Sequence, residues 1–400
     1  MKPLTDTVIL LRDTAEDEAV RAFAEAISGD DARSYAKAYA LLLRENMQNS
    51  FAEYLAQKIL RDGNLFAERA YNRTLDADTR RAMAYDLGLL QALANRTKSL
   101  PPALAAAAAE GMPQIGYGQD DGMFGRQWNS EKTLDSLARF FAQNGYGIFL
   151  GNKAFTYCGG ALRPVRNTSR ITLADLKNYE EEKRAVESNI ISFLRGLPYS
   201  DMLLYGDKGT GKSSTVHAML NKYAEEGLRA VELQKDQLSE INAVKELLSA
   251  LPFRFLLFID DLSLEEKDEK VTSLKASLEG SMNEKSDNVM IVATSNRRHI
   301  LKENFSDRDN SVHARDTMEE QLSLSDRFGL TVCFSSTGKA EYLSIVRQLA
   351  DDACLTLGGS ELDALAERWA IMKGGRSPRR AKQFVDYAFA CQAKHTEIDF

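Results

Sequence analysis

Hydrophobic positions along the chain follow two different periods, and the change from one period to the other divides the sequence. From Thr14 to about Asn144, apolar residues recur every three or four positions, which is the spacing of one helix face. Between Tyr146 and Val165 the period shifts toward two, with Gly-Asn and Gly-Gly turn signals, and this predicts a small β-hairpin. The pattern therefore predicts a mainly helical domain over residues 1–145, followed by a hairpin and linker over 146–170.

Downstream of residue 170, short apolar runs alternate with helical patterns. Helices are expected at Leu173–Leu194, Lys212–Tyr223 and Gln237–Leu251, and strands at Leu203–Tyr205, Ala230–Leu233, Phe255–Ile259 and Val289–Ala293. Fully apolar runs of this length are typical of strands buried in a parallel sheet. The expected fold class is therefore an α/β core over residues 171–336.

Helical periodicity returns beyond Ser336. Helices are expected at Glu341–Leu355, Ser360–Met372 and Ser377–Ala393, the last of them with proline at its first position, where its missing N–H costs nothing. These segments predict a helical lid domain over residues 337–400.

Composition changes this picture little. The net charge is -7, which mildly disfavours a generic nucleic-acid binder. The four cysteines are widely spaced, so neither a disulfide framework nor a zinc site is indicated and a reducing cytoplasm is expected. No apolar segment is long enough to span a membrane. We therefore expect a soluble cytoplasmic protein with no membrane partner.

A glycine-rich loop follows the first strand of the predicted core. It reads Gly206, Asp207, Lys208, Gly209, Thr210, Gly211, Lys212, Ser213 and Ser214. Glycines let the backbone N–H groups turn toward phosphates, the lysine reaches the β- and γ-phosphates, and the serine hydroxyl after it ligates Mg²⁺. The helix that follows adds its N-terminal dipole. This P-loop predicts ATP as the ligand, with Mg²⁺ as its metal.

Two carboxylates follow the Phe255–Ile259 run. In isolation, Asp260-Asp261 is typical of a helix cap or a turn, but an acidic residue at the end of a buried strand behind a P-loop is where Mg²⁺ is held. We therefore expect Ser213 and Asp260 to be the metal ligands and Asp261 to orient or deprotonate the attacking water.

The order of these motifs resembles one family of ATPases. After the P-loop and the acidic pair come Thr294-Ser295-Asn296, then Ser325-Asp326-Arg327-Phe328, then Gly374-Gly375-Arg376-Ser377-Pro378-Arg379. From about Leu173 to the C-terminus the chain resembles the AAA+ ATPases. It looks closest to a bacterial branch of predicted ATPases whose function is not established.

The resemblance implies roles for three further residues. It makes Asn296 the sensor 1 amide, Arg327 the arginine finger and Arg379 the sensor 2 arginine of the lid, with Arg376 and Arg380 as alternatives for the last role. Fixed donors with permanent charge suit a reaction that spreads charge over phosphate oxygens. The resemblance also implies self-association into a ring or spiral.

Two departures from the family pattern narrow the expected function. The acidic pair is Asp-Asp where most hydrolysing members have Asp-Glu, so hydrolysis is expected to be slow unless Glu265 or Glu266 supplies the longer reach. The stretch at 234–238 lacks the aromatic-hydrophobic-glycine pore loop of polypeptide unfoldases, which disfavours a threading motor. The polar insertion at 300–324 is either a partner-binding element or a solvated connector.

Three functions remain in view. The first is an ATP-hydrolysing machine that remodels a protein or a protein–nucleic acid complex whose identity the sequence does not give. The second is a nucleotide-gated switch with little hydrolysis. The third is a DNA-associated relative of helicase loaders, suggested by Arg297-Arg298 and the arginines of the lid, although nucleic acid is not the favoured partner.

Overall fold

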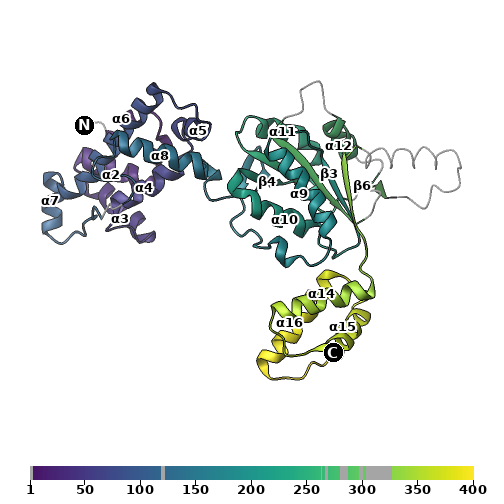
Figure 1. Ribbon diagram of the computed structural model, residues 1–400. Coiled ribbons are helices and arrows are strands. Elements are labelled where there is room, and N and C mark those ends of the chain that lie inside the picture. The colour runs from purple at the N-terminus through teal and green to yellow at the C-terminus, as the bar shows by residue number, and fades with distance from the viewer. Residues whose placement is uncertain are drawn as a thin grey trace. The chain divides into compact units, whose positions relative to one another are not determined.

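The chain divides into two compact units, Met1–Asn152 and Lys153–Phe400, in the computed structural model shown in Figure 1. The structure describes residues 3–118, 122–262, 264–265, 269–279, 287–296, 301–302 and 327–400. Each unit has its own hydrophobic core.

The first unit is built from helices, as the spacing of apolar residues predicts. Its α-helices are α1 (Arg12–Glu16), α2 (Glu18–Gly29), α3 (Ala32–Arg44), α4 (Phe51–Arg61), α5 (Leu65–Tyr71), α6 (Ala77–Asn95), α7 (Pro102–Ala109) and α8 (Glu131–Asn144), with short 3₁₀ turns at Leu4–Thr7, Arg96–Lys98 and Gly147–Phe149. Aromatic side chains fill the core, among them Phe23 and Phe51 with ring centroids 4.6 Å apart.

A buried carboxylate on α6 holds the start of the chain in this unit. Asp86 is fully buried, and its two oxygens accept hydrogen bonds from the backbone N–H groups of Ile9, Leu10 and Leu11 at 2.9, 2.6 and 3.0 Å. These three donors lie before α1 and outside any helix or strand, so Asp86 supplies the hydrogen-bond acceptor that this stretch of backbone needs.

Replacing Asp86 with alanine should lower the free energy of unfolding of this unit by about 2–4 kcal/mol, because three amides lose a charged acceptor. The measurement is urea unfolding followed by fluorescence in a Trp369→Phe background, which leaves buried Trp128 as the single tryptophan. The control is Asp78→Ala, on the same helix but with a side chain 82% exposed, which should change stability by less than about 0.5 kcal/mol. Equal effects of the two variants would show that Asp86 does not hold residues 9–11 in place.

The second unit is organised around a seven-stranded sheet in the order β2-β1-β4-β5-β7-β3-β9. The strands are β1 (Ala154–Cys158), β2 (Ala161–Pro164), β3 (Met202–Gly206), β4 (Leu228–Glu232), β5 (Arg254–Ile259), β7 (Val289–Ser295) and β9 (Leu330–Phe334). Every pairing is parallel except that of β1 with β2. A separate pair joins β6 (Leu264–Glu265) to β8 (Leu301–Lys302). The expected α/β class with a parallel sheet is confirmed.

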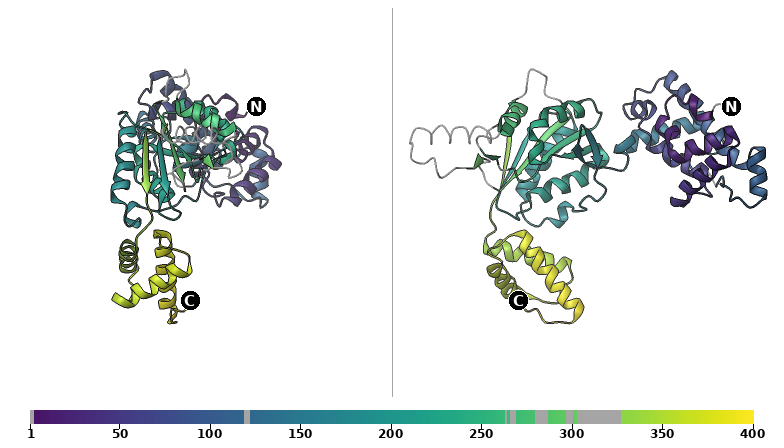
Figure 2. Two further views of the ribbon diagram at one scale, coloured as in Figure 1. Left: turned by 90° about the vertical axis from the view of Figure 1, so that its right-hand side faces the viewer. Right: turned by 180° about the vertical axis from the view of Figure 1, so that it is seen from behind.

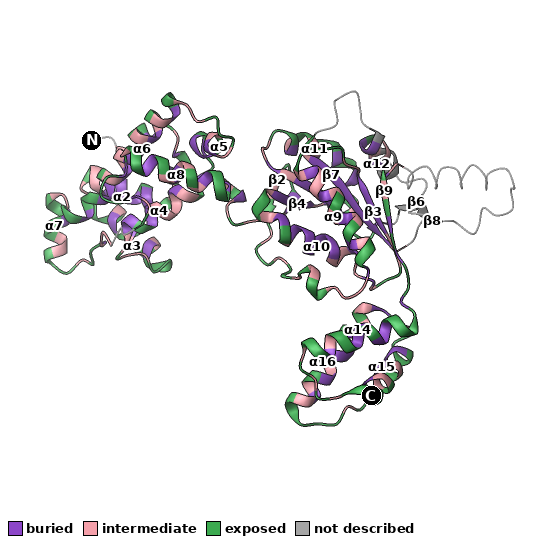
Figure 3. Cartoon of the chain, viewed as in Figure 1, coloured by how far each residue is buried: buried purple, intermediate pink, exposed green. Residues whose placement is uncertain are grey.

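Helices cover both faces of this sheet. Helices α9 (Glu180–Leu194) and α10 (Lys212–Tyr223) pack on one face through Val186, Ile190, Val216 and Met219. Helices α11 (Ile241–Ser249) and α12 (Glu269–Glu279) lie on the other face of the sheet (Figure 1). The central strands are buried along their length (Figure 3), which is why their sequences are continuous apolar runs and do not alternate.

The hairpin that the sequence places in a linker is part of the sheet. Strand β1 pairs in parallel with β4, with Phe155 opposite Val231. Phe155 and Tyr157 are buried, whereas the alternate residues Ala154, Thr156 and Cys158 are less so. An edge strand leaves unpaired backbone groups, and the hairpin supplies β4 with a partner.

The helix expected from Leu173 begins later than the pattern indicates. A 3₁₀ turn at Leu173–Asp175, with Thr172 and Asp175 forming a capping box, is followed by α9 from Glu180. Asn178 and Tyr179 have φ values of 68° and 62°, a left-handed conformation that interrupts a right-handed helix. Similarly, α11 is preceded by a 3₁₀ segment at Lys235–Glu240.

The chain ends in a three-helix bundle of its own, visible in both views of Figure 2. Its helices are α14 (Lys339–Asp352), α15 (Gly359–Met372) and α16 (Pro378–Lys394). Tyr342, Ala366 and Phe384 are fully buried at its centre, and Trp369 stacks on Tyr387 with ring centroids 5.4 Å apart. These are the helices that the sequence predicts for the lid.

Candidate nucleotide-binding site

The sequence motifs meet at one edge of the sheet because of the strand order. The P-loop follows β3, the acidic pair follows β5, and Asn296 follows β7, which lies between them. The carboxyl ends of parallel strands share one edge, which is the usual place for a ligand in an open α/β sheet. Residues that lie tens of positions apart in the sequence are therefore close together at the carboxyl ends of these strands.

Glycine is required at the start of the P-loop. Gly206 has a φ of 134°, and a Cβ there would lie 2.0 Å from the carbonyl oxygen of Phe334. Gly209 and Gly211 have φ values of 81° and 101°, which glycine adopts without strain. The Thr210 hydroxyl donates to the Asp207 carbonyl at 2.9 Å and ties the loop to itself.

Lys212 lies inside the loop that precedes it. Its ammonium donates to the carbonyl oxygens of Gly206 and Asp207 at 2.8 and 2.7 Å and to the Asn296 side-chain oxygen at 3.3 Å. Burial lowers the pKa of Lys212, against the opposing effect of nearby carboxylates such as Asp207. Since burial penalises the positive charge, a phosphate at this position would be strongly favoured.

Ser213 and Asp260, the two predicted metal ligands, are in direct contact. The Ser213 hydroxyl donates to Asp260 Oδ1 at 2.5 Å. A hydroxyl and a carboxylate side by side are hard oxygen donors of the kind that Mg²⁺ prefers when it is bound through few protein ligands. The residues present therefore fit this metal.

Asp261 adopts a left-handed backbone conformation, with φ 52°, which Asp tolerates better than most residues. Its Oδ1 accepts a hydrogen bond from the Asn296 side-chain amide. The Lys235 ammonium lies 3.7 Å from its Oδ2. Asp261 and Asn296, to which the sequence analysis gives separate roles, therefore lie within hydrogen-bonding distance of each other.

Two residues at this edge are absent from the sequence prediction. Lys235 comes from the segment after β4, and Thr294 from the end of β7, where its hydroxyl contacts Asp260. Alternation along β7 places Thr294 on the same side as Asn296, a signal that could have revealed it. The closeness of Lys235 to Asp261 is visible only in the tertiary structure, because α11 and β5 separate the two residues in the sequence.

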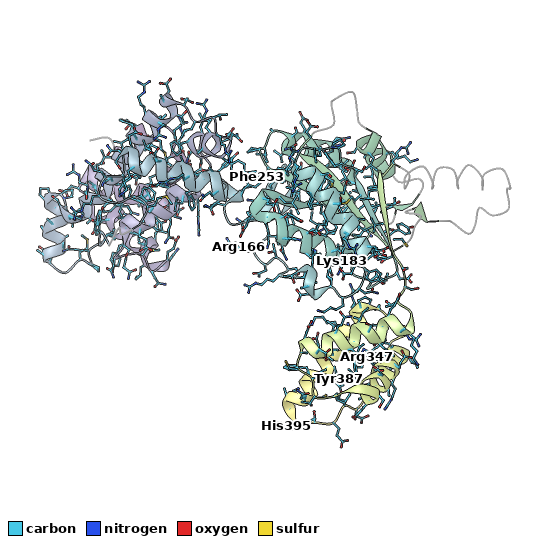
Figure 4. All side chains as sticks on the ribbon, viewed as in Figure 1. Arg166, Lys183, Phe253, Arg347, Tyr387 and His395 are labelled. Atoms are coloured by element: carbon cyan, nitrogen blue, oxygen red, sulfur yellow. The ribbon has the colours of Figure 1, made fainter. Side chains whose placement is uncertain are left out.

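A cavity of about 910 Å³ extends from the P-loop toward the lid, a size in the usual range for a small-molecule ligand. Its apolar wall includes Ile171, Leu176, Ile345 and Leu349. The segment before α9 forms one side, and Lys183, labelled in Figure 4, donates to the Leu176 carbonyl at 2.6 Å. The cavity therefore combines a polar phosphate end with an apolar end suited to a nucleobase.

The lid reaches the P-loop through the start of α16. The Arg379 backbone N–H donates to the Gly209 carbonyl at 3.1 Å, and Arg379 lines the cavity. The alternative Arg376 forms a forked pair with Glu367, both bonds being 2.8 Å. This hydrogen bond lowers the pKa of Glu367. Of these two arginines, Arg379 is the one placed at the loop.

Arg327 lies near the amino end of β9, whereas the P-loop lies at the carboxyl ends of the parallel strands. It precedes β9, whose last residue, Phe334, pairs with Gly206 beside the P-loop. The five residues of β9 span roughly 16 Å at about 3.3 Å per residue, farther than an arginine side chain reaches. Arg327 is not among the described residues that line the cavity.

Several sequence predictions lie outside the described residues. These are the roles of Glu266, Arg297-Arg298 and Ser325-Asp326, and most of the 300–324 insertion, of which the structure describes only β8. Glu265 lies in β6. Within the described part of the chain, every helix is too short or too polar to cross a bilayer.

A P-loop, an acidic pair and a polar amide meet at the carboxyl ends of parallel strands, with a helical lid against the loop, and this is the architecture of an AAA+ P-loop fold. The resemblance seen in the sequence is confirmed. A family model described as "Protein of unknown function (DUF815)" matches residues 151–392. The chain belongs to that family.

Solved structures are similar at a lower level, and no curated protein matches the chain significantly in sequence. The RuvB Holliday junction branch migration motor of Thermotoga maritima is 15% identical with a TM-score of 0.39, over 56% of this chain and 67% of that one. The FIGL-1 AAA domain, solved with ADP, is 18% identical with a TM-score of 0.39, over 57% and 76%. The Aeropyrum pernix Orc1 protein, solved with DNA, is 17% identical with a TM-score of 0.40, over 56% and 62%.

Proposed function

We propose that this protein binds ATP with Mg²⁺ and hydrolyses it to remodel a protein or a protein–nucleic acid complex. The observation that supports this best is the contact between Ser213 of the P-loop and Asp260, because a carboxylate 47 positions away in the chain has no structural need to lie beside the P-loop serine. Steady-state phosphate release with ATP and Mg²⁺ tests the proposal. No release above that of a Lys212→Ala variant would contradict hydrolysis.

The chain's own residues bind and orient the nucleotide. Lys212 and the N-terminus of α10 attract the phosphates, and Arg379 from the lid adds a permanent positive charge at the same end of the cavity. Ser213 and Asp260 would hold Mg²⁺, which when bound would neutralise the negative charge that develops in phosphoryl transfer. Asn296 and Asp261, which are joined by a hydrogen bond, orient the attacking water in this proposal.

A nucleotide-gated switch is the second candidate function, and one observation favours it. The Asp261 carboxylate lies between the Asn296 amide and the Lys235 ammonium. Each oxygen of Asp261 therefore already contacts a protein donor, and an attacking water would have to compete with these donors for the carboxylate. Tight nucleotide binding with negligible phosphate release would support the switch.

Replacing Asp261 with asparagine should lower ATP turnover by about a hundredfold, because a neutral amide cannot accept the proton and general bases typically contribute that much or more. Lengthening it to Asp261→Glu should raise turnover severalfold, because the longer side chain reaches farther from its left-handed backbone toward the water. The measurement is phosphate release at saturating ATP, with exposed Asp236→Asn as the control. Unchanged rates in both variants would move the role elsewhere, first to Glu265.

A further inference from the structure

Thr294 lies between the two strands that carry the site. Its backbone pairs with Leu204 of the P-loop strand β3, and on the other side Ala293 pairs with Ile259 of β5, just before the acidic pair. Thr294 is only 1% exposed. A buried hydroxyl at this position needs polar partners, and the ones it has belong to the acidic pair.

The Thr294 hydroxyl makes both kinds of hydrogen bond that it is capable of making. It donates to Asp260 Oδ1 at 2.6 Å and accepts from the backbone N–H of Asp261 at 2.9 Å. A threonine hydroxyl has a single hydrogen to donate, and here that hydrogen goes to a carboxylate, which makes the bond charge-assisted and strong. One side chain therefore contacts both members of the acidic pair.

The bond to Asp260 fixes the orientation of the carboxylate expected to bind the metal. Asp260 Oδ1 also accepts the Ser213 hydroxyl at 2.5 Å. Because Ser213 is itself a candidate ligand of Mg²⁺, Thr294 is the partner that holds Asp260 without competing for the metal. Outer partners of this kind orient metal ligands and are often nearly as important as the ligands themselves.

The second bond holds the backbone from which Asp261 projects. Asp261 is left-handed, with φ 52°, and the next residue, Leu262, donates its N–H to the Thr294 carbonyl at 2.7 Å. These two bonds to one residue secure the turn after β5. Without them Asp261 would relax toward the ordinary right-handed region, and its carboxylate would move away from Asn296.

We propose that Thr294 is a positioning residue that fixes Asp260 for the metal ion and Asp261 for the attacking water. The proposal rests on the proposed ATPase function. It states that a buried hydroxyl holds the two carboxylates of that site in position. In this role Thr294 acts through Asp260 and Asp261, to which its hydroxyl is hydrogen-bonded.

The test compares Thr294→Val, which keeps the shape and removes the hydroxyl, with Thr294→Ser, which keeps the hydroxyl. The readout is the factor by which Mg²⁺ tightens binding of a fluorescent, non-hydrolysable ATP analogue relative to EDTA. Thr294→Val should reduce that factor by about tenfold, the lower end of the range for residues behind metal ligands, and leave affinity in EDTA unchanged. Thr294→Ser should stay within about threefold of wild type.

The control is Thr97→Val in the first unit, which removes a buried hydroxyl that donates to the Ala94 carbonyl, and the Mg²⁺ factor should not change. If Thr294→Val does not fold, Thr294→Cys serves instead, because a thiol is a weak hydrogen-bonding group of similar size. A wild-type Mg²⁺ factor in folded Thr294→Val, or in Thr294→Cys where that variant replaces it, overturns the proposal. So does a loss in Thr294→Ser as large as that in Thr294→Val, since the methyl group would then be what matters.

A double-mutant cycle separates positioning from general structural damage. In an Asp260→Asn background, Thr294→Val should have little further effect on the Mg²⁺ factor, whereas independent damage would add. Full additivity overturns the proposal. If the wild-type protein binds the analogue neither in EDTA nor with Mg²⁺, the proposed function itself has failed.

Discussion

Replacing Lys212 with alanine should weaken ATP binding by a hundredfold or more and abolish turnover. A charge-assisted hydrogen bond contributes about 1.5–3 kcal/mol, and the Lys212 ammonium, now bonded to two loop carbonyls, can make at least two such bonds to phosphates. Burial lowers the pKa of this lysine because it disfavours the positive charge. A negatively charged phosphate beside the ammonium would offset that penalty. The measurement is titration with a fluorescent ATP analogue.

The matched control for this prediction is Lys222→Ala, near the other end of the same helix, where the ammonium pairs with Glu187 at 2.5 Å. Its nucleotide affinity should be that of wild type. Asp260→Ala should behave differently from both variants, retaining binding in EDTA and losing Mg²⁺-dependent turnover. Wild-type binding and hydrolysis in both Lys212→Ala and Asp260→Ala would show that the P-loop assignment is wrong.

Replacing Arg327 with alanine should reduce turnover on the order of a thousandfold, which is the usual value of an arginine supplied in trans to phosphoryl transfer, and should leave ATP affinity nearly unchanged. The physical reason is its position. Arg327 precedes β9 at the amino end of the parallel strands, away from its own P-loop, and we propose that it reaches the nucleotide of another subunit. Such a contact is head-to-tail and generates a ring or an open spiral.

Mixing variants tests whether the site is shared. Arg327→Ala has an intact P-loop and Lys212→Ala has an intact Arg327, so mixed interfaces should restore part of the turnover that each lacks alone. Arg139→Ala, an exposed arginine of α8, should have no effect. A wild-type rate for Arg327→Ala, together with strictly monomeric light scattering in ATP and Mg²⁺, would refute the shared site and favour the switch.

The sequence alone determined the chemistry that is local in the chain. The P-loop, the acidic pair and Asn296 are each contiguous with an apolar run, and a buried strand needs such a run whatever its neighbours are. The spacing of apolar residues likewise predicted the lid helices, since one face of each must be buried. The left-handed residues Asn178 and Tyr179 were not predicted, because tertiary contacts such as the bond from the Tyr179 hydroxyl to the Ser335 carbonyl hold them in place.

The tertiary structure alone decided which of these local pieces face one another. Strand order follows from hydrogen-bond ladders between distant segments, and it places β7 between β3 and β5. That order brings the Thr294 hydroxyl to Asp260 across 34 positions and Lys235 to Asp261, and it makes the hairpin an edge of the sheet. It also sets Arg327 apart from its own P-loop. Pairing of this kind depends on the packing of the whole core, so no local pattern in the chain encodes it.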